Sequence, residues 1–244
     1  MSETNWPACA AVFGASGGIG GALCGELAER GVRVWAMSRS GDAALAGVDA
    51  DRRLRCDLTD EASIAAAAGI MRRDPPHWVI LATGVLTLDD GTGPERSYRQ
   101  IDAAAMERAF RVNAIGPALV AKHLLPLFAR DARCVFAALS ARVGSIGDNR
   151  LGGWHSYRAS KAALNMLLRN LAIELARTHP EAIVAGLHPG TVDSALSKPF
   201  QANLPPAQLH TPDRAARDLI AVLSHLTPAD SGAVFDWQGA KIAP

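Results

Sequence analysis

The sequence has few of the features that mark secreted, metal-binding or membrane proteins. It contains only four cysteines in 244 residues, and they lie too far apart for a Cys-x-x-Cys pair, so neither a disulfide framework nor a zinc site is expected. The seven histidines lack the His-x-x-x-His spacing of a helical metal site, and we expect no bound metal. No apolar run approaches the roughly 20 residues that a membrane-spanning helix needs. The first residues lack the basic segment of a secretion signal, which predicts a cytoplasmic protein.

An excess of charge of one sign is also lacking. The 25 lysines and arginines nearly balance the 24 aspartates and glutamates, which gives a net charge of +1. Such a protein offers no general basic field for nucleic acid. We therefore expect a small-molecule partner and neither nucleic acid nor a membrane. The length is sufficient for one domain over residues 1–244 with a full apolar core.

What is present is an alternation of short apolar runs with longer segments of helical period. This alternation is typical of a parallel sheet with helices on both faces. The expected strands are residues 8–14, 32–39, 53–58, 77–83, 133–140, 182–188 and 233–237. The expected helices are residues 18–30, 60–72, 103–130, 156–178 and 212–226. The sequence thus predicts the α/β class, with a single Rossmann-fold domain built on a doubly wound seven-stranded parallel sheet.

Two further features of the chain, its long connections and a bend in one expected helix, bear on the position of a functional site. The long connections over residues 85–102 and 191–210 hold most of the irregular sequence, and such loops usually line a site. We expect the second, over about residues 191–211, to contact the substrate. The helix expected over residues 103–130 contains Gly116-Pro117. Because proline lacks a backbone donor, we expect the helix to bend just after Asn113.

A glycine-rich segment follows the first expected strand and opens the first expected helix. It reads Gly14-Ala-Ser-Gly-Gly-Ile-Gly20. Glycines at this position let the backbone approach a pyrophosphate that is bound at the helix N-terminus. In the alternative interpretation they serve only tight packing between strand and helix. Their place in the first strand–helix unit favours a dinucleotide.

Tyr157 and Lys161 are four residues apart in an expected helix, so both side chains project from one face. A tyrosine hydroxyl, with a pKa of about 10 in model peptides, is a poor acid–base group at neutral pH unless a nearby cation stabilises its phenolate. Lys161 supplies such a cation. In the alternative interpretation the two residues are an ordinary pair on a helix surface.

With these two motifs the chain resembles the short-chain dehydrogenase/reductase family, whose glycine pattern matches Gly14, Gly18 and Gly20. The resemblance extends over nearly the whole chain. Residues 143–164, which include Gly152-Gly153-Trp154, are most similar to the carbonyl reductase and C-factor-like subgroup. The resemblance implies a homodimer or homotetramer in which the helices over residues 103–130 and 156–178 pack against their copies.

The end of the second expected strand bears on which dinucleotide is bound. An acidic side chain there would accept hydrogen bonds from the adenosine ribose, whereas this chain has Ser38 and Arg39. A guanidinium can pair with a 2′-phosphate, so NADP(H) is favoured over NAD(H). In the alternative, Arg39 is a solvated surface charge, Asp42 reaches the ribose, and NAD(H) is bound.

The resemblance implies further cofactor contacts. Asp57 and Leu58 would flank the adenine, residues 82–84 would pass beneath the ribose, and the turn after the sixth strand would contact the nicotinamide carboxamide. The expected cofactor-binding residues are Gly14, Ser16, Gly18, Ile19, Gly20, Ser38, Arg39, Asp57, Leu58, Ala82, Thr83, Gly84, Tyr157, Lys161, Pro189, Gly190, Thr191 and Val192.

The resemblance also implies two catalytic groups besides Tyr157 and Lys161. Asn113 would anchor a water and extend the proton relay past Lys161, or it is a helix-bend residue only. A serine after the fifth strand would polarise the substrate carbonyl, but the family position falls on Ala141. Ser140 is the candidate for this role and Ser145 the fallback. If neither reaches the carbonyl, the loss of one donor costs about 10²–10³ in rate.

The sequence therefore predicts an NAD(P)-dependent oxidoreductase. In this hypothesis NADPH reduces a ketone or aldehyde while Tyr157 donates the proton, or the reverse oxidation occurs. The alternative is a C-factor-like signalling or interaction protein that binds the dinucleotide with little or no catalysis. The Tyr157–Lys161 pair favours the enzyme, whereas Ala141 favours the alternative.

Overall fold

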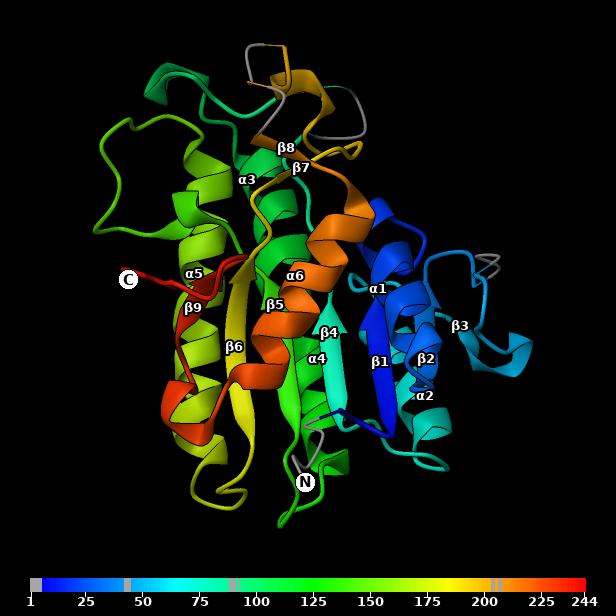
Figure 1. The fold of residues 1–244 in the computed structure, drawn as a ribbon. Coiled ribbons are helices and arrows are strands. Elements are labelled where there is room, and N and C mark those ends of the chain that lie inside the picture. Colours follow the sequence, from blue (N-terminus) through cyan, green and yellow to red (C-terminus); the bar gives the residue numbers. More distant parts are fainter. Residues whose placement is uncertain (1–5, 42–44, 88–90, 92, 203–204, 206–207) are drawn as a thin grey trace.

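The computed structural model describes residues 6–41, 45–87, 91, 93–202, 205 and 208–244. Its centre is an eight-stranded sheet with the order β10-β9-β6-β5-β4-β1-β2-β3 (Figure 1). The strands are β1 (Cys9–Phe13), β2 (Arg33–Ser38), β3 (Arg53–Arg55), β4 (Trp78–Leu81), β5 (Val135–Leu139), β6 (Ile183–His188), β9 (Val234–Asp236) and β10 (Lys241–Ile242). All seven expected strands are present and parallel, which confirms the predicted Rossmann arrangement.

The sequence prediction missed the eighth strand of this sheet. β10 is only two residues long and pairs antiparallel with β9, with Ile242 opposite Val234. A two-residue strand at a sheet edge carries no alternation or apolar run that a sequence could show. The seven-stranded prediction is therefore corrected to eight strands, of which the last is antiparallel.

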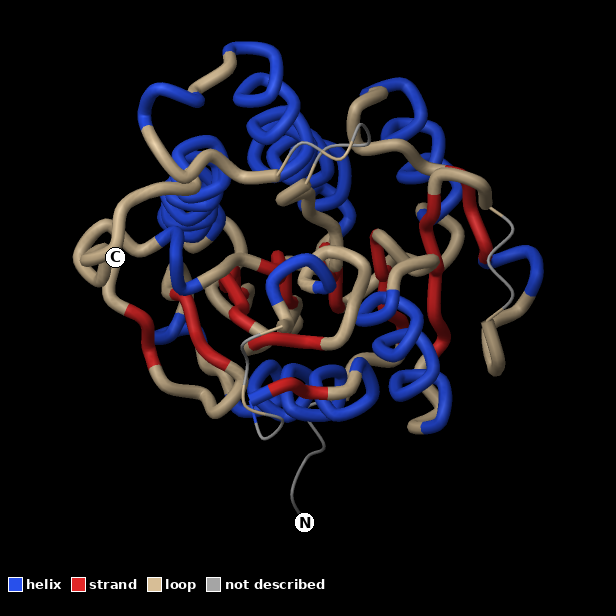
Figure 2. Tube along the Cα trace, turned by 90° about the horizontal axis from the view of Figure 1, so that it is seen from above, coloured by secondary structure: helices blue, strands red, loops and turns tan. Residues whose placement is uncertain are grey.

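The central strands are apolar because helices cover both of their faces. All five residues of β1 are buried, and the strand pairs with β2 on one side and β4 on the other. Such doubly covered parallel strands have continuous apolar sequences rather than alternating ones. Figure 2 shows the resulting layers, with helices on either side of the sheet.

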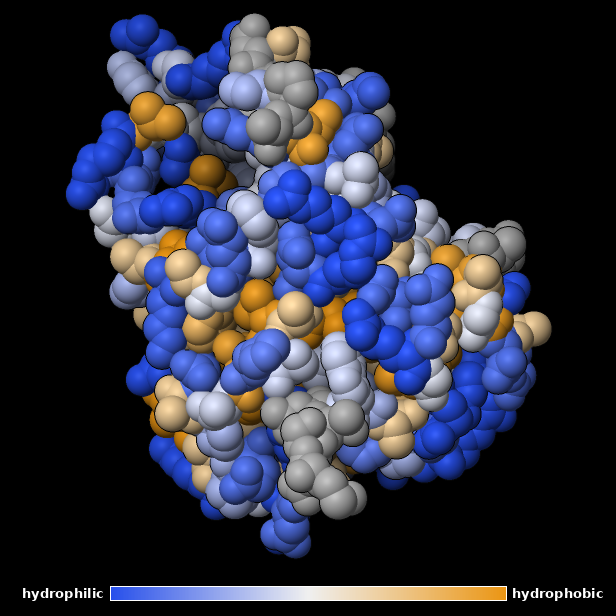
Figure 3. Space-filling view, viewed as in Figure 1, coloured by the Kyte–Doolittle hydropathy of each residue, from blue (hydrophilic) through white to orange (hydrophobic). Residues whose placement is uncertain are grey.

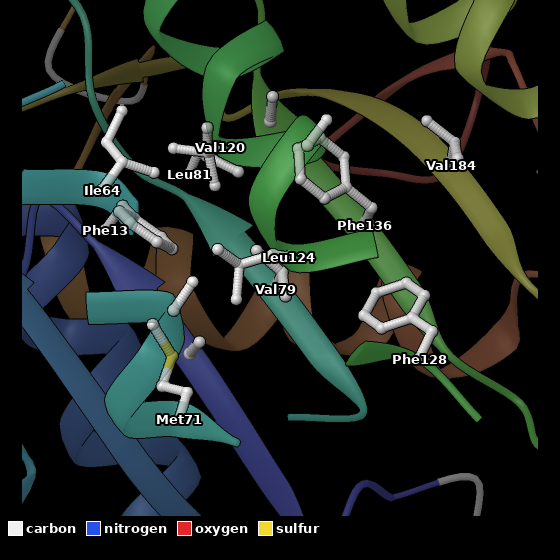
Figure 4. Packing of buried hydrophobic residues seen from close by; sticks show 14 of the residues in the cluster. Phe13, Ile64, Met71, Val79, Leu81, Val120, Leu124, Phe128, Phe136 and Val184 are labelled. Carbon is white, nitrogen blue, oxygen red and sulfur yellow. The ribbon is translucent and has the colours of Figure 1, made fainter. Parts of the chain in front are cut away.

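Helices α1 (Gly18–Glu29) and α6 (Pro212–His225) pack together on one face of the sheet. Their apolar residues join Ala10 and Val12 of β1 in one core. On the other face lie α2 (Glu61–Met71), α3 (Ala103–Phe110), α4 (Gly116–Leu124) and α5 (His155–Leu175). Figure 4 shows the second core, in which Phe13, Leu81 and Phe136 of the sheet meet residues of α2 and α4. Hydrophilic atoms cover the upper turns of α6, which therefore turns a polar side to solvent (Figure 3).

The long helix expected over residues 103–130 is divided differently from the prediction. A π-helical turn, η3 (Arg111–Ile115), joins α3 to α4, and Pro117 lies in the first turn of α4. Proline is tolerated there because a first-turn amide has no partner within the helix. The irregularity thus includes Asn113 instead of following it. Turns of the π type occur frequently at functional sites.

The segment expected as a loop after residue 191 also contains regular structure. Thr191–Val192 (β7) and Leu209–His210 (β8) form a small parallel sheet, and Lys198–Phe200 (η6) is a short 3₁₀ helix. This segment lies above the carboxyl ends of the large sheet (Figure 1). Among the described residues, no helix combines the length and apolar character needed to cross a bilayer.

Candidate active site

The glycine-rich turn brings the chain back on itself directly above β1. Gly14 has a φ of +85°, and a Cβ added there would lie 2.7 Å from the carbonyl oxygen of Ala82. A Cβ on Gly20 would lie 2.1 Å from the carbonyl oxygen of Gly14. Real Cβ atoms essentially never come this close, so both positions require glycine.

This turn leads into the N-terminus of α1, where no side chain caps the first-turn amides. Gly17 is the N-cap residue, and the first turn holds no acidic residue. Free amides and the positive end of the helix dipole form a binding place for an anion. Ser16 is exposed beside it, and Gly18 and Ile19 begin the helix. The predicted pyrophosphate-binding residues therefore lie together.

The strand ends beside this turn bear the residues expected at the adenosine. Ser38 is buried, and its hydroxyl accepts a hydrogen bond from Gly41 N at 2.9 Å. The Arg39 side chain is exposed. Hydrogen bonds from Thr59 hold the pKa of Asp57 below its usual range, and the positive charge of Arg39 adds to this effect. Arg39 and Asp57 thus influence each other across the ends of β2 and β3. Asp42 lies outside the described residues.

After β4 the chain passes beneath the glycine turn and reaches the catalytic helix. Ala82 N donates to Phe13 O at 2.8 Å, and Thr83 Oγ1 is buried with no hydrogen-bond partner within the described part of the chain. A Cβ added to Gly84 would be 3.4 Å from Lys161 Nζ and 3.4 Å from Asn113 Oδ1. Residues 82–84 therefore connect the glycine turn to the expected catalytic residues.

Tyr157 and Lys161 lie one turn apart near the start of α5, and both are buried. Lys161 Nζ donates to Leu139 O at 2.7 Å and lies 5.8 Å from the centre of the Tyr157 ring. Burial raises the pKa of Tyr157 and lowers the pKa of Lys161 to about 8. The arrangement places a phenol, an ammonium group and the Gly84 backbone together at the carboxyl ends of β4 and β5.

The Asn113 side chain is fully engaged by the protein. Its Oδ1 accepts from Val85 N at 2.8 Å, and its Nδ2 donates to Val85 O at 2.9 Å and to Ser160 Oγ at 3.1 Å. These bonds attach η3 to the chain after Gly84 and to α5. In this π turn Gly116 N donates to Arg111 O, five residues back. The water relay expected at Asn113 stays a prediction.

The serines considered for polarising the carbonyl both form hydrogen bonds within the protein. Ser140 is buried, and its Oγ donates to Asn165 Oδ1 at 2.6 Å. Ser145 Oγ accepts from Asp148 N at 3.0 Å and donates to Pro244 O at 3.4 Å. Ala141 lies between them without a hydroxyl. The catalytic role of Ser140 therefore stays a prediction, which requires its hydroxyl to leave Asn165.

Substitution of these serines separates the two candidates. If Ser140 polarises the carbonyl, Ser140→Ala is expected to lower kcat by about 10²–10³, the usual effect of losing one preorganised donor. Ser145→Ala is then expected to have little effect. Steady-state kcat with any reducible carbonyl measures both variants. Turnover of Ser140→Ala equal to wild type would remove Ser140 from the mechanism.

The turn after β6 contains the residues expected at the nicotinamide. Gly190 has a φ of +74°, and a Cβ there would lie 3.1 Å from Trp237 Cδ1 and 3.3 Å from His210 Cε1. The His210 and Trp237 rings meet edge to face at 4.5 Å. Burial lowers the pKa of His188, just before this turn, to about 4. Sequence reasoning missed His210 and Trp237 because they lie 20 and 47 residues after Gly190 and belong to no local motif.

A cavity of about 370 Å³ reaches Tyr157 from the side of α3. Its lining is mainly apolar and includes Val85, Leu86, Pro94, Ala105 and Ala109. Glu95 and Ser156 also line it. Concave, mostly apolar spaces with a few polar groups are typical of small-molecule sites.

Comparison with known proteins agrees with this geometry. The model of the short chain dehydrogenase family matches residues 8–205. The chain belongs to this family. It is accordingly an NAD(P)-dependent oxidoreductase, and it is similar in sequence to the C-signal. The family match agrees with the glycine turn and the Tyr157–Lys161 pair.

Three similar proteins illustrate the range of this family. The C-signal of Myxococcus xanthus is 38% identical over 143 residues, which are 58% of this chain and 80% of that protein. The 1-hydroxy-2-glutathionyl-2-methyl-3-butene dehydrogenase of Rhodococcus sp. (strain AD45) is 32% identical over 225 residues, 91% of this chain and 92% of the relative. A short-chain dehydrogenase/reductase structure from Burkholderia multivorans with bound NADP is 25% identical, has a TM-score of 0.77, and covers 97% of this chain and 99% of its own.

Proposed function

We propose that the protein reduces a ketone or aldehyde with NADPH in the cytoplasm, or catalyses the reverse oxidation. The observation that carries the proposal is the position of Lys161, which lies one helical turn from Tyr157 and has its Nζ 3.4 Å from a Cβ position at Gly84. Asn113 Oδ1, from η3, lies at the same distance from that position. NADPH consumption with a panel of aldehydes and ketones tests it. A cytoplasmic location suits the four buried, unpaired cysteines, since thiols stay reduced there.

The residues present fit a nicotinamide dinucleotide. Gly14 and Gly20 let the turn fold tightly, because a Cβ at either position would collide with the backbone of Ala82 or of Gly14. The uncapped N-terminus of α1 that follows this turn offers its amides to a pyrophosphate. Thr83 Oγ1, a buried hydroxyl without a partner in the described residues, lies on the path to Gly84 and offers a hydrogen bond to the ligand. Ser38, Arg39, Asp57 and Leu58 would hold the adenosine end, and residues 189–192 the nicotinamide end.

When bound, the dinucleotide supplies or accepts the hydride. In the reductive direction Tyr157 Oη donates a proton to the carbonyl oxygen, and a phenolate forms in a buried place that disfavours its charge. The ammonium group of Lys161 stabilises this phenolate. Lys161 is itself held in place by its hydrogen bond to Leu139 O. The hydrogen bond from Asn113 to Ser160 holds η3 against α5 and so fixes the position of η3 relative to the catalytic helix.

The preference for NADPH is proposed from the exposed Arg39 and the absence of a carboxylate at the end of β2. Arg39→Ala is expected to weaken NADPH binding by roughly 10- to 150-fold, since a guanidinium–phosphate pair contributes about 1.5–3 kcal/mol, and to leave NADH binding nearly unchanged. Fluorescence titration of both cofactors measures this. Arg33→Ala, which removes an exposed arginine at the opposite end of β2, is the control. Equal affinities for NADPH and NADH in the wild type would contradict the assignment.

A second candidate function is dinucleotide-dependent signalling with little catalysis. Ala141 and the engaged hydroxyls of Ser140 and Ser145 favour it, and so does the similarity to the C-signal. In either function we propose self-association through α4 and α5. Met166 and Ile173 of α5 are exposed apolar side chains that a second copy of the chain would cover.

A further inference from the structure

Trp154 has an unusual backbone conformation immediately before the catalytic helix. Its φ is +51° and its ψ is +43°, and it alone among the non-glycine residues that the structure describes has a positive φ. The two residues before it, Gly152 and Gly153, have φ values of +64° and +66°. For a bulky side chain this conformation is a genuine outlier that the surroundings must enforce.

Several hydrogen bonds enforce this conformation. Trp154 N donates to Glu95 O, and the buried Glu95 carboxylate accepts from the backbone N and the Oγ of Ser156. The Arg158 guanidinium donates to Gly153 O at 3.1 Å and to Val143 O at 3.2 Å. Burial raises the pKa of Glu95, but hydrogen bonds to its carboxylate, mainly from Ser156, more than offset this effect. The pKa of Glu95 is therefore below its usual range, and the carboxylate stays charged. The segment before α5 is thus fixed from both sides.

The consequence of this conformation is the position of the indole ring. The Trp154 ring meets the Tyr157 ring edge to face, with centroids 6.3 Å apart, and lies 5.0 Å from the Phe200 ring. Trp154 and Phe200 are both partly exposed. Leu196, from the same segment as Phe200, has its Cδ1 3.8 Å from a Cβ position at Gly84. Residues 196–200 therefore extend from the Lys161 side of the site to the indole.

We propose that Trp154 and Phe200 form an aromatic wall that binds an aryl group attached to the reacting carbonyl. The inference rests on the proposed function and names its substrate class. Strained residues persist where the side chain has to occupy one place, and here that place is beside Tyr157. Aromatic rings gain an additional attraction in edge-to-face and offset arrangements, which a saturated ring of the same size does not share. The wall thus selects flat aryl ketones and aldehydes over their saturated counterparts.

A purely structural role for Trp154 makes a different prediction. If the indole only fastens residues 196–200 to α5, its removal would weaken aryl and saturated ligands to the same degree. If Trp154 is part of a wall, its removal instead changes the ratio of the affinities for aryl and saturated ligands. The ratio is therefore the quantity to measure.

The test uses pairs of ligands with the same carbon skeleton. Binding of benzamide and cyclohexanecarboxamide to the complex of the protein with NADP⁺ is measured by calorimetry, and reduction of acetophenone and cyclohexyl methyl ketone is measured as kcat/KM. The wild type is expected to favour the aryl member by about threefold to tenfold in both assays. Trp154→Leu and Trp154→Asn are expected to bring the ratio to about one. Asparagine tolerates a positive φ and so keeps the backbone. Trp154→Phe should retain part of the preference.

Leu151→Ala, which alters a side chain that is 91% exposed in the same loop, is the matched control and should keep the wild-type ratio. A wild-type ratio of about one, or an unchanged ratio in Trp154→Leu and Trp154→Asn, overturns the wall. Discrimination between the amides without reduction of either ketone overturns the proposed function for these substrates and leaves the wall in place. Reduction of both ketones with no aryl preference supports the proposed function and overturns the wall.

Discussion

Tyr157→Phe is expected to lower the turnover of any reducible carbonyl by roughly 10²–10⁴-fold while NADPH binds nearly as in the wild type. The substitution removes only the hydroxyl that donates the proton. The ring stays against Trp154 and Lys161, so the packing at the start of α5 is retained. Steady-state kinetics and fluorescence titration of NADPH measure the two effects separately.

The chain offers a matched control for this experiment. Tyr98, its other tyrosine, is 66% exposed at the start of a short 3₁₀ helix, Tyr98–Gln100. Tyr98→Phe removes the same atom from the protein surface and should leave turnover unchanged. A thermal melt of both variants excludes a difference in folding. If Tyr157→Phe turns over as fast as Tyr98→Phe, Tyr157 is not the proton donor.

Loss of the positive charge at Lys161 is expected to have the second largest effect. Burial lowers the pKa of Lys161 to about 8, so the group is charged below that pH and neutral above it. Because the charge stabilises the phenolate that forms on Tyr157, kcat/KM for reduction should fall about tenfold per pH unit above pH 8. Lys161→Met should lower kcat/KM at pH 7 by about 10² or more and remove this descending limb. Lys122→Met, at an exposed position on α4, is the control.

The same lowered pKa has a consequence for folding. The unfolded chain holds this proton up to a pH of about 10.4, whereas the folded chain releases it near 8. Between these values the unfolded state binds more protons, so the contribution of Lys161 to stability rises with pH. A pH profile of activity that falls above 8 while the free energy of unfolding does not fall therefore assigns the loss to chemistry. A profile that is flat through pH 8 contradicts the role of Lys161.

The sequence allowed prediction of the features that depend on local pattern. Apolar runs predicted the central parallel strands because helices cover both of their faces, as all five buried residues of β1 illustrate. The glycine turn was predictable because a Cβ on Gly20 would collide with the backbone of Gly14, six residues away. Tyr157 and Lys161 were predictable because helical spacing brings them to one face.

Features that depend on distant parts of the chain were not predictable. The two residues of β10 form a strand only because β9 lies beside them. The π turn at Asn113 depends on its bonds to Val85 and Ser160, which lie 28 and 47 residues away. The left-handed Trp154 depends on Glu95, 59 positions earlier in the sequence.

The serine question shows the same limit within a single motif. Counting from Gly144 identified Ala141 as the family position and left Ser140 and Ser145 open. The structure adds the partner of each hydroxyl, Asn165 for Ser140 and Asp148 with Pro244 for Ser145. The Asp148 amide is a local partner, three residues from Ser145, but Asn165 and Pro244 could not be found by spacing because they lie 25 and 99 residues from their serines.

The measurement that tests the central claim most directly is NADPH oxidation by the wild-type protein with a broad panel of aldehydes and ketones, with the alcohol product quantified. The account predicts that at least one carbonyl is reduced, with one alcohol formed for each NADPH consumed, and that Tyr157→Phe abolishes both signals while it still binds NADPH. A wild-type protein that binds NADPH, reduces nothing on the panel and behaves as Tyr157→Phe does would contradict the reductase and favour the signalling function.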